Sequence, residues 1–287
     1  MAVETRVIRQ ANVLGLTAFG TAGRLAAFPV GTSLKELRAG LAPATVEVRA
    51  TGRSFLALLP DECVLEPDPV ETGLFKGKNT LVAFRNGETA EAVVDWLAYH
   101  GDGHDAEAAL IIDRDPPGGD FATDLQAKSV EIPVVVASLE HPLGLPTAPD
   151  ARHPALAPAA PARRSPPIDP WHAPLAQLAI YELLRHRFLA EASAVLFLNP
   201  SDLLVPDPAG QVFHRIKSAA GSFVQARGIE CYPWRLRKGH PAPHADHIAE
   251  RRGERRRISS WGAAPCGRCA PLDRGARSPP AGRGAGA

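Results

Sequence analysis

The sequence predicts an α/β protein in which a mostly parallel sheet is flanked by helices. Three short apolar runs support this prediction, because residues 80–84 (TLVAF), 108–112 (AALII) and 131–137 (EIPVVVA) are each long enough for one buried strand. A helical pattern separates the first run from the second. Strands that alternate with helices are typical of βαβ units, whose ligands bind at the carboxyl ends of the strands.

The helix that follows the first strand is expected at residues 88–100. Its apolar residues recur at the spacing i, i+3, i+4 and i+7, which places them on one face: Ala90, Val93, Val94 and Leu97. We therefore expect this helix to cover one side of the sheet.

The second half of the main domain begins after a proline-rich segment. Ten prolines between residues 141 and 174 predict a loop, because proline removes a backbone donor and interrupts helices. Two interpretations of this loop stay open, a disordered surface insertion and a loop that covers a substrate. A helix at 174–191 and a fourth buried strand at 194–198 (AVLFL) are expected next, followed by strands at 223–231 and 233–236.

Two flanking segments complete the predicted organisation around a main domain at 78–250. Residues 1–77 are interpreted as a small α/β or β-rich segment, with strand patterns at 45–49 and 54–59. Residues 251–287 are rich in Arg, Gly and Pro and poor in core formers, so we expect a disordered tail. A reading frame shifted after about residue 255 is a second interpretation of this composition.

The charge distribution argues against a nucleic-acid-binding protein. Nine of the 32 basic and two of the 31 acidic residues lie in 251–287, which leaves 23 basic and 29 acidic residues, a net charge of −6, in 1–250. An acidic body repels phosphate. The Arg-rich run at 251–257 could still touch an anionic membrane surface, and an interaction protein with a basic tail is a further alternative.

Other function classes are disfavoured by hydropathy and cysteine usage. The apolar runs of about five residues are far shorter than the ~20 that span a bilayer, so no transmembrane segment is expected. Four scattered cysteines fit a reducing compartment, which predicts a cytoplasmic location. Two further patterns, His244-x-x-His247 and Cys266-x-x-Cys269, are weak metal candidates that surface positions explain better.

Polar side chains follow three of the expected strands where each strand ends. Arg85 and Asn86 follow the first, Asp113 and Asp115 the second, and 199–202 (NPSD) the fourth. Carboxylates at such positions can accept hydrogen bonds from a nucleotide or hold Mg²⁺ or Mn²⁺ against its phosphates. The structural alternative is that Asp and Asn simply favour turns.

Residues 80–100, TLVAFRNGETAEAVVDWLAYH, resemble the opening of bacterial family 2-like glycosyltransferases. In that group a strand leads into an Arg-Asn-Glu segment and then into a helix with Glu/Asp-Trp-Leu-x-Tyr-His. The matching residues are Arg85, Asn86, Glu88 (displaced one place by Gly87), Asp95, Trp96, Leu97, Tyr99 and His100. The similarity covers roughly 78–250, and the Trp-Leu-x-Tyr-His helix is its most specific part.

The resemblance implies a GT-A fold and the transfer of a sugar from a nucleotide-sugar donor to a glycan, lipid or protein acceptor. It implies that Asp113 holds the nucleoside, with Arg85 and Asn86 near the nucleotide, and Asp115 joins these candidates through its position after the same strand. Asp202, with Asn199 as a second candidate, would face the diphosphate through a divalent cation, Mn²⁺ or Mg²⁺.

The chain departs from the family pattern in its acidic motif. Asn199 and Pro200 stand where an acid is expected, which leaves Asp202 as one firm carboxylate and weakens the expected metal affinity. A non-catalytic nucleotide- or glycan-binding relative is therefore the alternative function. For the general base of an active enzyme, Asp246 and Glu230 are the candidates.

Overall fold

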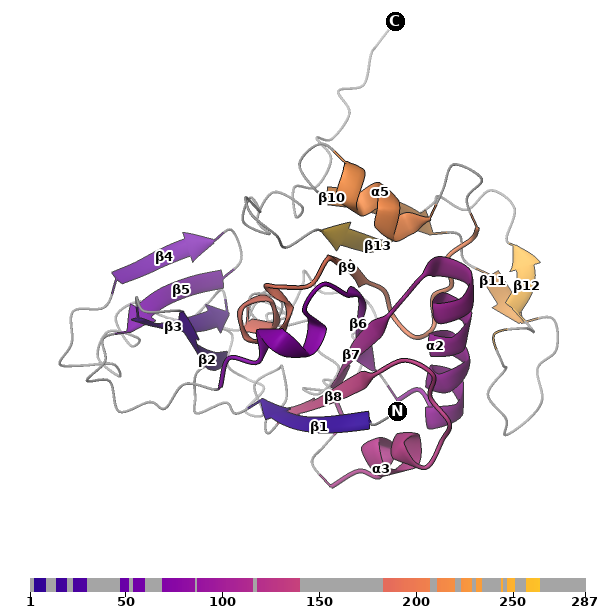
Figure 1. Ribbon diagram of the computed structural model, residues 1–287, viewed down its shortest axis with the longest axis horizontal. Helices are drawn as coiled ribbons and strands as arrows, with labels where there is room; N and C mark the ends of the chain where they lie inside the picture. The colour runs from indigo at the N-terminus through magenta and orange to yellow at the C-terminus, as the bar shows by residue number, and fades with distance from the viewer. Residues whose placement is uncertain are drawn as a thin grey trace, which may run out of the picture.

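The computed structural model describes residues 3–8, 14–19, 23–29, 47–51, 54–59, 69–85, 87–115, 118–139, 183–206, 211–219, 223–228, 231–233, 244, 247–250 and 257–263. Their strands form a seven-stranded, a four-stranded and a two-stranded sheet (Figure 1). The seven-stranded sheet and the helices packed on it hold the candidate site.

The seven-stranded sheet has the order β1-β8-β7-β6-β9-β13-β10. Its first five strands are parallel, and β13 is antiparallel to both of its neighbours. The coarse prediction of an α/β protein with a mostly parallel sheet is confirmed. The strands are β1 (Val3–Ile8), β6 (Asn79–Arg85), β7 (Ala108–Asp113), β8 (Val134–Leu139), β9 (Ala194–Phe197), β10 (Phe223–Gly228) and β13 (Arg257–Ala263).

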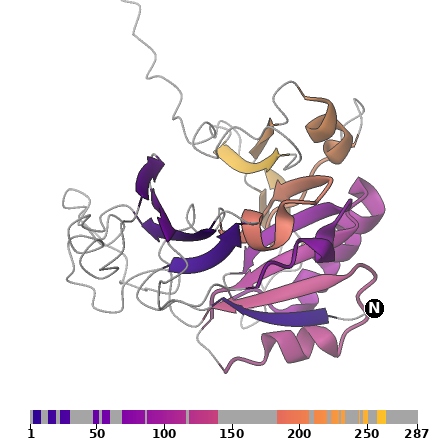
Figure 2. The same cartoon turned by 60° about the vertical axis from the view of Figure 1, so that its left-hand side comes forward.

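Helices cover both faces of the parallel strands (Figures 1 and 2). On one face, α2 (Ala90–His104), α3 (Phe121–Gln126) and α5 (Val212–Ser218) enclose an apolar cluster around Trp96 and Leu125. On the other, the 3-10 helix η1 (Thr72–Phe75) and the π-helix η2 (Arg185–Leu189) enclose a second cluster. The central strands are buried on both sides, which explains why the sequence shows them as continuous apolar runs.

The predicted helix after β6 is α2, and its ends have local causes. The side chain of Thr89 accepts a hydrogen bond from the backbone N–H of Ala92 and so caps the N-terminus. Asp105 ends the helix in the left-handed conformation, at φ 57°. Ala90, Val93 and Leu97 are buried as expected.

The order of the parallel strands reverses at β6. From β6 the chain proceeds through α2 to β7 and then through α3 to β8 on one side, whereas β9 pairs with the opposite edge of β6. The loops after β6 and β9 both start at the carboxyl edge of the sheet, and the helices that follow them, α2 and α5, lie on the same face. In open α/β sheets ligands bind at the carboxyl ends of the strands.

The N-terminal segment is divided between two sheets. The antiparallel four-stranded sheet, of order β2-β3-β5-β4, agrees with the β-rich interpretation: β2 (Leu14–Phe19), β3 (Gly23–Pro29), β4 (Glu47–Thr51) and β5 (Ser54–Leu59). In contrast, β1 pairs in parallel with β8, so the main domain includes residues well before 78. This pairing was not predicted because β1 (VETRVI) is a polar edge strand without a continuous apolar run.

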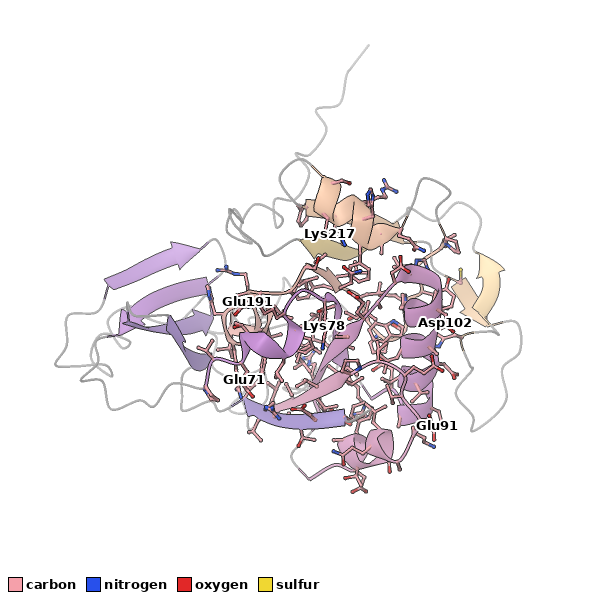
Figure 3. All side chains as sticks on the ribbon, in the orientation of Figure 1. Glu71, Lys78, Glu91, Asp102, Glu191 and Lys217 are labelled. Atoms are coloured by element: carbon pink, nitrogen blue, oxygen red, sulfur yellow. The ribbon has the colours of Figure 1, made fainter. Side chains whose placement is uncertain are left out.

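Glu71 fixes β1 to the η2 side of the sheet. Arg6 Nε lies 2.5 Å from Glu71 Oε1, and Arg187 Nη2 lies 3.1 Å from Oε2. Arg187, only 3% exposed, also donates to the carbonyl of Val7 at 3.0 Å. Figure 3 shows Glu71 and Glu191 near η1, on the opposite side of the central strands from Glu91 and Asp102 of α2.

The C-terminal half differs from the expectation at two places. Of the helix predicted at 174–191, residues 183–191 are described, and they run from two α-helical residues into η2, which ends at Leu189. Residues 257–263, within the segment expected to be disordered, form β13 between β9 and β10. The local sequence explains this strand, because RISSWGA has an Ile and a Trp and lacks the prolines of the following residues.

The remaining strands, β11 (Cys231–Pro233) and β12 (His247–Glu250), pair in an antiparallel ribbon. The proline-rich segment 141–174 lies outside the described residues. Within the described part of the chain, none of the helices combines the length and the apolar character needed to cross a bilayer.

Candidate functional site

Two groups of polar side chains lie at the carboxyl edge of the sheet, one on each side of the end of β6. We call them together the rim. The β7 side consists of Arg85, Asp113 and Asp115, and the β9 side consists of Glu88, Asn199 and Asp202. Register fixes this arrangement: Arg85 of β6 is paired with Asp113 of β7, and the N–H of Leu198 donates to the carbonyl of Val82 in β6 at 3.0 Å.

The β7 side of the rim is a compact ion cluster. Nη1 of Arg85 donates to Asp113 Oδ1 at 2.8 Å and also bonds to Asp115 Oδ2. The guanidinium lies over the ring of Phe121 at 4.1 Å, and its Nε donates to the carbonyl of Glu88 at 2.6 Å. Arg85 and Asp113 are each 7% exposed. This cluster is held from β6, β7 and α3 together.

The β9 side of the rim carries an electrostatically unfavourable carboxyl group. Burial raises the pKa of Asp202, and the negative charge of Glu88 raises it further, while hydrogen bonds from the side chain and the backbone of Asn199 act in the opposite direction. The carboxyl groups of Asp202 and Glu88 are therefore close enough to interact. Among the described residues, Asp202 forms no salt bridge with a cationic side chain.

The donor set around Asp202 fits one kind of metal site only. The described residues contain no group of three His, Cys, Asp or Glu side chains that could hold an ion by themselves. Mg²⁺, however, is commonly held by one or two carboxylates together with substrate phosphates. Asp202 could supply one such carboxylate, and Glu88, whose charge acts on Asp202, is the candidate for a second.

The residues that the sequence singled out separate into three groups. Arg85, Asp113 and Asp115 come together, as expected from the strand ends. Asn199 lies beside Asp202, where it donates hydrogen bonds to the Asp202 carboxyl group. The other candidates lie outside the described residues: Asn86, Asp246 and Glu230, together with Cys266 and Cys269.

The contacts that the Trp-Leu-x-Tyr-His helix makes with the loop after β9 were not predicted from the sequence. The indole Nε1 of Trp96 donates to the carbonyl of Asp202 at 3.1 Å, and the hydroxyl of Tyr99 donates to the carbonyl of Leu204. Nε2 of His244, a residue considered above as half of a metal pair, lies 2.7 Å from the carbonyl oxygen of Pro200. These partners are 44 to 106 residues apart in the chain, so no local pattern could reveal them.

Comparisons with protein-family models, with curated proteins and with solved structures gave no match for this chain. The strand order and the rim are therefore the observations on which a function can be built.

Proposed function

We propose that the chain is a glycosyltransferase of GT-A type that moves a sugar from a nucleotide-sugar donor to a glycan, lipid or protein acceptor. The observation that carries the proposal is the position of the rim at the carboxyl edge of the parallel strands, with carboxyl groups on both sides of β6. In open α/β sheets nucleotides bind at the carboxyl ends of the strands. The resemblance of residues 80–100 to family 2-like glycosyltransferases is the reason for proposing that the ligand is a nucleotide-sugar. The scattered cysteines suggest that the protein is cytoplasmic.

The two sides of the rim suit two parts of a donor. On the β7 side, Asp113 accepts from Arg85 and from the N–H of Asp115, and its position at the end of β7 suits a hydroxyl of the nucleoside. On the β9 side, Asp202 and Glu88 are suited to the diphosphate through a shared cation.

In sugar transfer an acceptor oxygen bonds to the anomeric carbon while the bond from that carbon to the diphosphate breaks. The leaving diphosphate gains negative charge, and a divalent cation would neutralise it as a Lewis acid. Asp202 and Glu88 would hold the diphosphate end in place, and Asn199 orients the Asp202 carboxyl group through its hydrogen bonds. A general base would accept the proton of the acceptor hydroxyl, and Asp246 and Glu230 stay proposals for that role.

The test is calorimetric titration with UDP, GDP, CDP and dTDP, each with and without MnCl2. We expect at least one nucleotide to bind, and we expect Mn²⁺ to raise its affinity. Asp202→Asn should abolish the effect of Mn²⁺. Asp102→Asn is the matched control, because Asp102 is an exposed carboxylate on the same helix as Trp96 and remote from the rim, and it should behave as wild type. Failure of all four nucleotides to bind below about 1 mM would overturn the proposal.

A non-catalytic nucleotide-binding protein is the second candidate, favoured by Asn199 and Pro200 in place of acids. Hydrolysis of the matching nucleotide-sugar separates the two functions. Slow release of free sugar, supported by Mn²⁺ and lost in Asp202→Asn, indicates the enzyme. Binding of the intact donor without turnover, in the presence of glycan and lipid acceptors, indicates the binding protein.

A further inference from the structure

The loop after β9 is held by side chains at alternate residues. The carbonyls of Pro200 and Asp202 lie against His244 Nε2, at 2.7 Å, and Trp96 Nε1, at 3.1 Å. The carbonyl of Leu204 faces both the hydroxyl of Tyr99 and, at 3.1 Å, Nε2 of His104. Main-chain atoms on both sides of Asp202 are thus anchored.

Three of these anchors form one face of α2 together with His100, whose Nε2 accepts from the N–H of Leu204. We call this face the α2 clamp: Trp96, Tyr99, His100 and His104. The spacing i, i+3, i+4 and i+8 places them on one side of the helix. Their rings pack on one another, with centroids 5.0 Å apart for Tyr99 and His100 and 5.6 Å apart for His100 and His104. Packing of this kind limits the rotamers of the donors that reach the loop.

His100 has the hydrogen-bonding pattern of a neutral imidazole. Its Nδ1 lies 2.8 Å from the carbonyl of Trp96, which can only accept, so Nδ1 carries the hydrogen. Its Nε2 lies 3.4 Å from the backbone N–H of Leu204, which can only donate, so Nε2 offers its lone pair. One tautomer satisfies both partners in a site where the side chain is fully buried.

We propose that His100 and Tyr99, with the rest of the α2 clamp, are positioning residues for Asp202. They fix the main chain of the loop so that the Asp202 carboxyl group stays beside Glu88 and faces the diphosphate of the donor. This role rests on the proposed function.

The physical need for a clamp follows from the position of Asp202. Its carboxyl group is partly buried and lies near another negative charge, an arrangement from which an unrestrained loop would move toward water. The residues of the loop from Asp202 on have no helix or strand hydrogen bonds of their own. Side-chain donors that anchor the carbonyls of Asp202 and Leu204 therefore keep the carboxyl group where a cation and a diphosphate can use it.

Three substitutions separate positioning from simple packing. Tyr99→Phe removes one hydroxyl from a partly exposed ring. His100→Asn keeps a polar group near Nδ1 but cannot reach Leu204, whereas His100→Gln reaches about as far as Nε2 and restores an acceptor. Gln126→Ala is the matched control, because Gln126 Nε2 donates to the carbonyl of Val3 at 3.0 Å, a bond of the same kind between α3 and β1.

The first measurement is hydrogen exchange in the full chain, with urea unfolding to correct for global stability. In Tyr99→Phe and His100→Asn the amide of Leu204 should exchange about three- to tenfold faster than in wild type, while amides of β6 and β7 keep their rates. His100→Gln and Gln126→Ala should leave the loop unchanged. If the loop exchanges at the wild-type rate in both Tyr99→Phe and His100→Asn, the α2 clamp is overturned.

The second measurement is the affinity for the nucleoside diphosphate that wild type binds, with and without MnCl2. Tyr99→Phe and His100→Asn should weaken binding in Mn²⁺ about three- to tenfold and leave binding without Mn²⁺ unchanged, a split that loss of stability would not produce. Equal affinities in Mn²⁺ for wild type and both variants overturn the positioning role. If the loop exchanges faster but wild type binds none of the nucleotides, the proposed function fails and the clamp is supported.

Discussion

The two sides of the rim lie at the same edge of the sheet, but they differ in how their carboxylates are neutralised. On the β7 side, Arg85 neutralises Asp113 and Asp115 within a buried cluster. On the β9 side, Asp202 is desolvated near Glu88, and hydrogen bonds from Asn199 only partly offset the resulting rise in its pKa. The carboxylates of the β7 side are thus neutralised within the chain, whereas Asp202 on the β9 side forms no salt bridge with a described cationic side chain.

This difference indicates which carboxylates are available for chemistry. Carboxylates already paired with a buried guanidinium contribute to stability and orientation, and removing one partner leaves an unpaired charge. A carboxylate kept in an unfavourable place by its surroundings is typical of functional sites. The contrast can be tested by substitutions on the two sides, which should change the free energy of unfolding in opposite directions.

The largest expected effect is on the β7 side. Arg85→Met should lower the free energy of unfolding by about 3 to 5 kcal/mol, because it leaves Asp113 buried and charged without its partner. Urea unfolding at pH 7 measures the change. Lys76→Met is the control, since Lys76 bonds to Glu191 at 2.8 Å with 72% of its side chain exposed, and its effect should be far smaller. Equal effects of the two substitutions would contradict a structural role for the Arg85 cluster.

The next largest expected effect is a pH dependence of the free energy of unfolding, caused by His100 beside the loop after β9. Burial lowers the pKa of His100 from its ordinary value of 6.5 to about 4, and the positive charges of His104 and His244 act in the same direction although its bond to the Trp96 carbonyl opposes them. Below pH 6.5 the unfolded chain therefore binds a proton that the folded protein does not. The stability present above pH 6.5 should decline as the pH falls to about 4, by about 3 kcal/mol in total.

The measurement for His100 is urea unfolding between pH 7 and pH 4 in wild type and in His100→Gln. Other groups titrate in this range in both proteins, so the difference between the two curves isolates His100. The curves should converge by about 3 kcal/mol toward acid pH. Curves that stay parallel would show that His100 does not titrate as a buried neutral imidazole.

The smallest expected effect is a gain in stability, caused by a substitution on the β9 side. Folding raises the pKa of Asp202 above its ordinary value of 3.8, so its ionisation reduces stability as the pH rises through the raised pKa. At pH 7, Asp202→Asn should therefore stabilise the protein, on the order of 0.5 kcal/mol because solvent screens the partly exposed group. Thermal unfolding of this variant and of Asp113→Asn provides the comparison. Destabilisation by both would mean that the two sides of the rim do not differ.

Much of the parallel sheet can be predicted from the sequence, because strands buried on both faces leave continuous apolar runs. The runs at 80–84, 108–112 and 194–198 differ from β6, β7 and β9 by one residue at each end at most. The polar edge strand β1 and the antiparallel β13 carry no such signal. Their pairing depends on partners far away in the chain.

The candidate site is predictable only where it depends on strand ends. Parallel strands bring their carboxyl ends to one edge, so Arg85, Asp113 and Asp115 could be grouped in advance. The approach of Glu88 to Asp202 and the contact between Trp96 and Asp202 depend on how the loop after β9 runs along α2. That path is set by side chain–backbone hydrogen bonds, which have no sequence periodicity.

The most direct test of the central claim, that a nucleotide binds at the rim between β6 and β9, is a crystal soaked with MnCl2 and the nucleoside diphosphate selected by calorimetry. Anomalous scattering would locate the Mn²⁺ independently of the nucleotide density. The account predicts one Mn²⁺ bound to the Asp202 carboxylate and to both phosphates, with the nucleoside on the Asp113 side of β6. A nucleotide bound away from the carboxyl edge of the sheet, or a Mn²⁺ that does not contact Asp202, would contradict it.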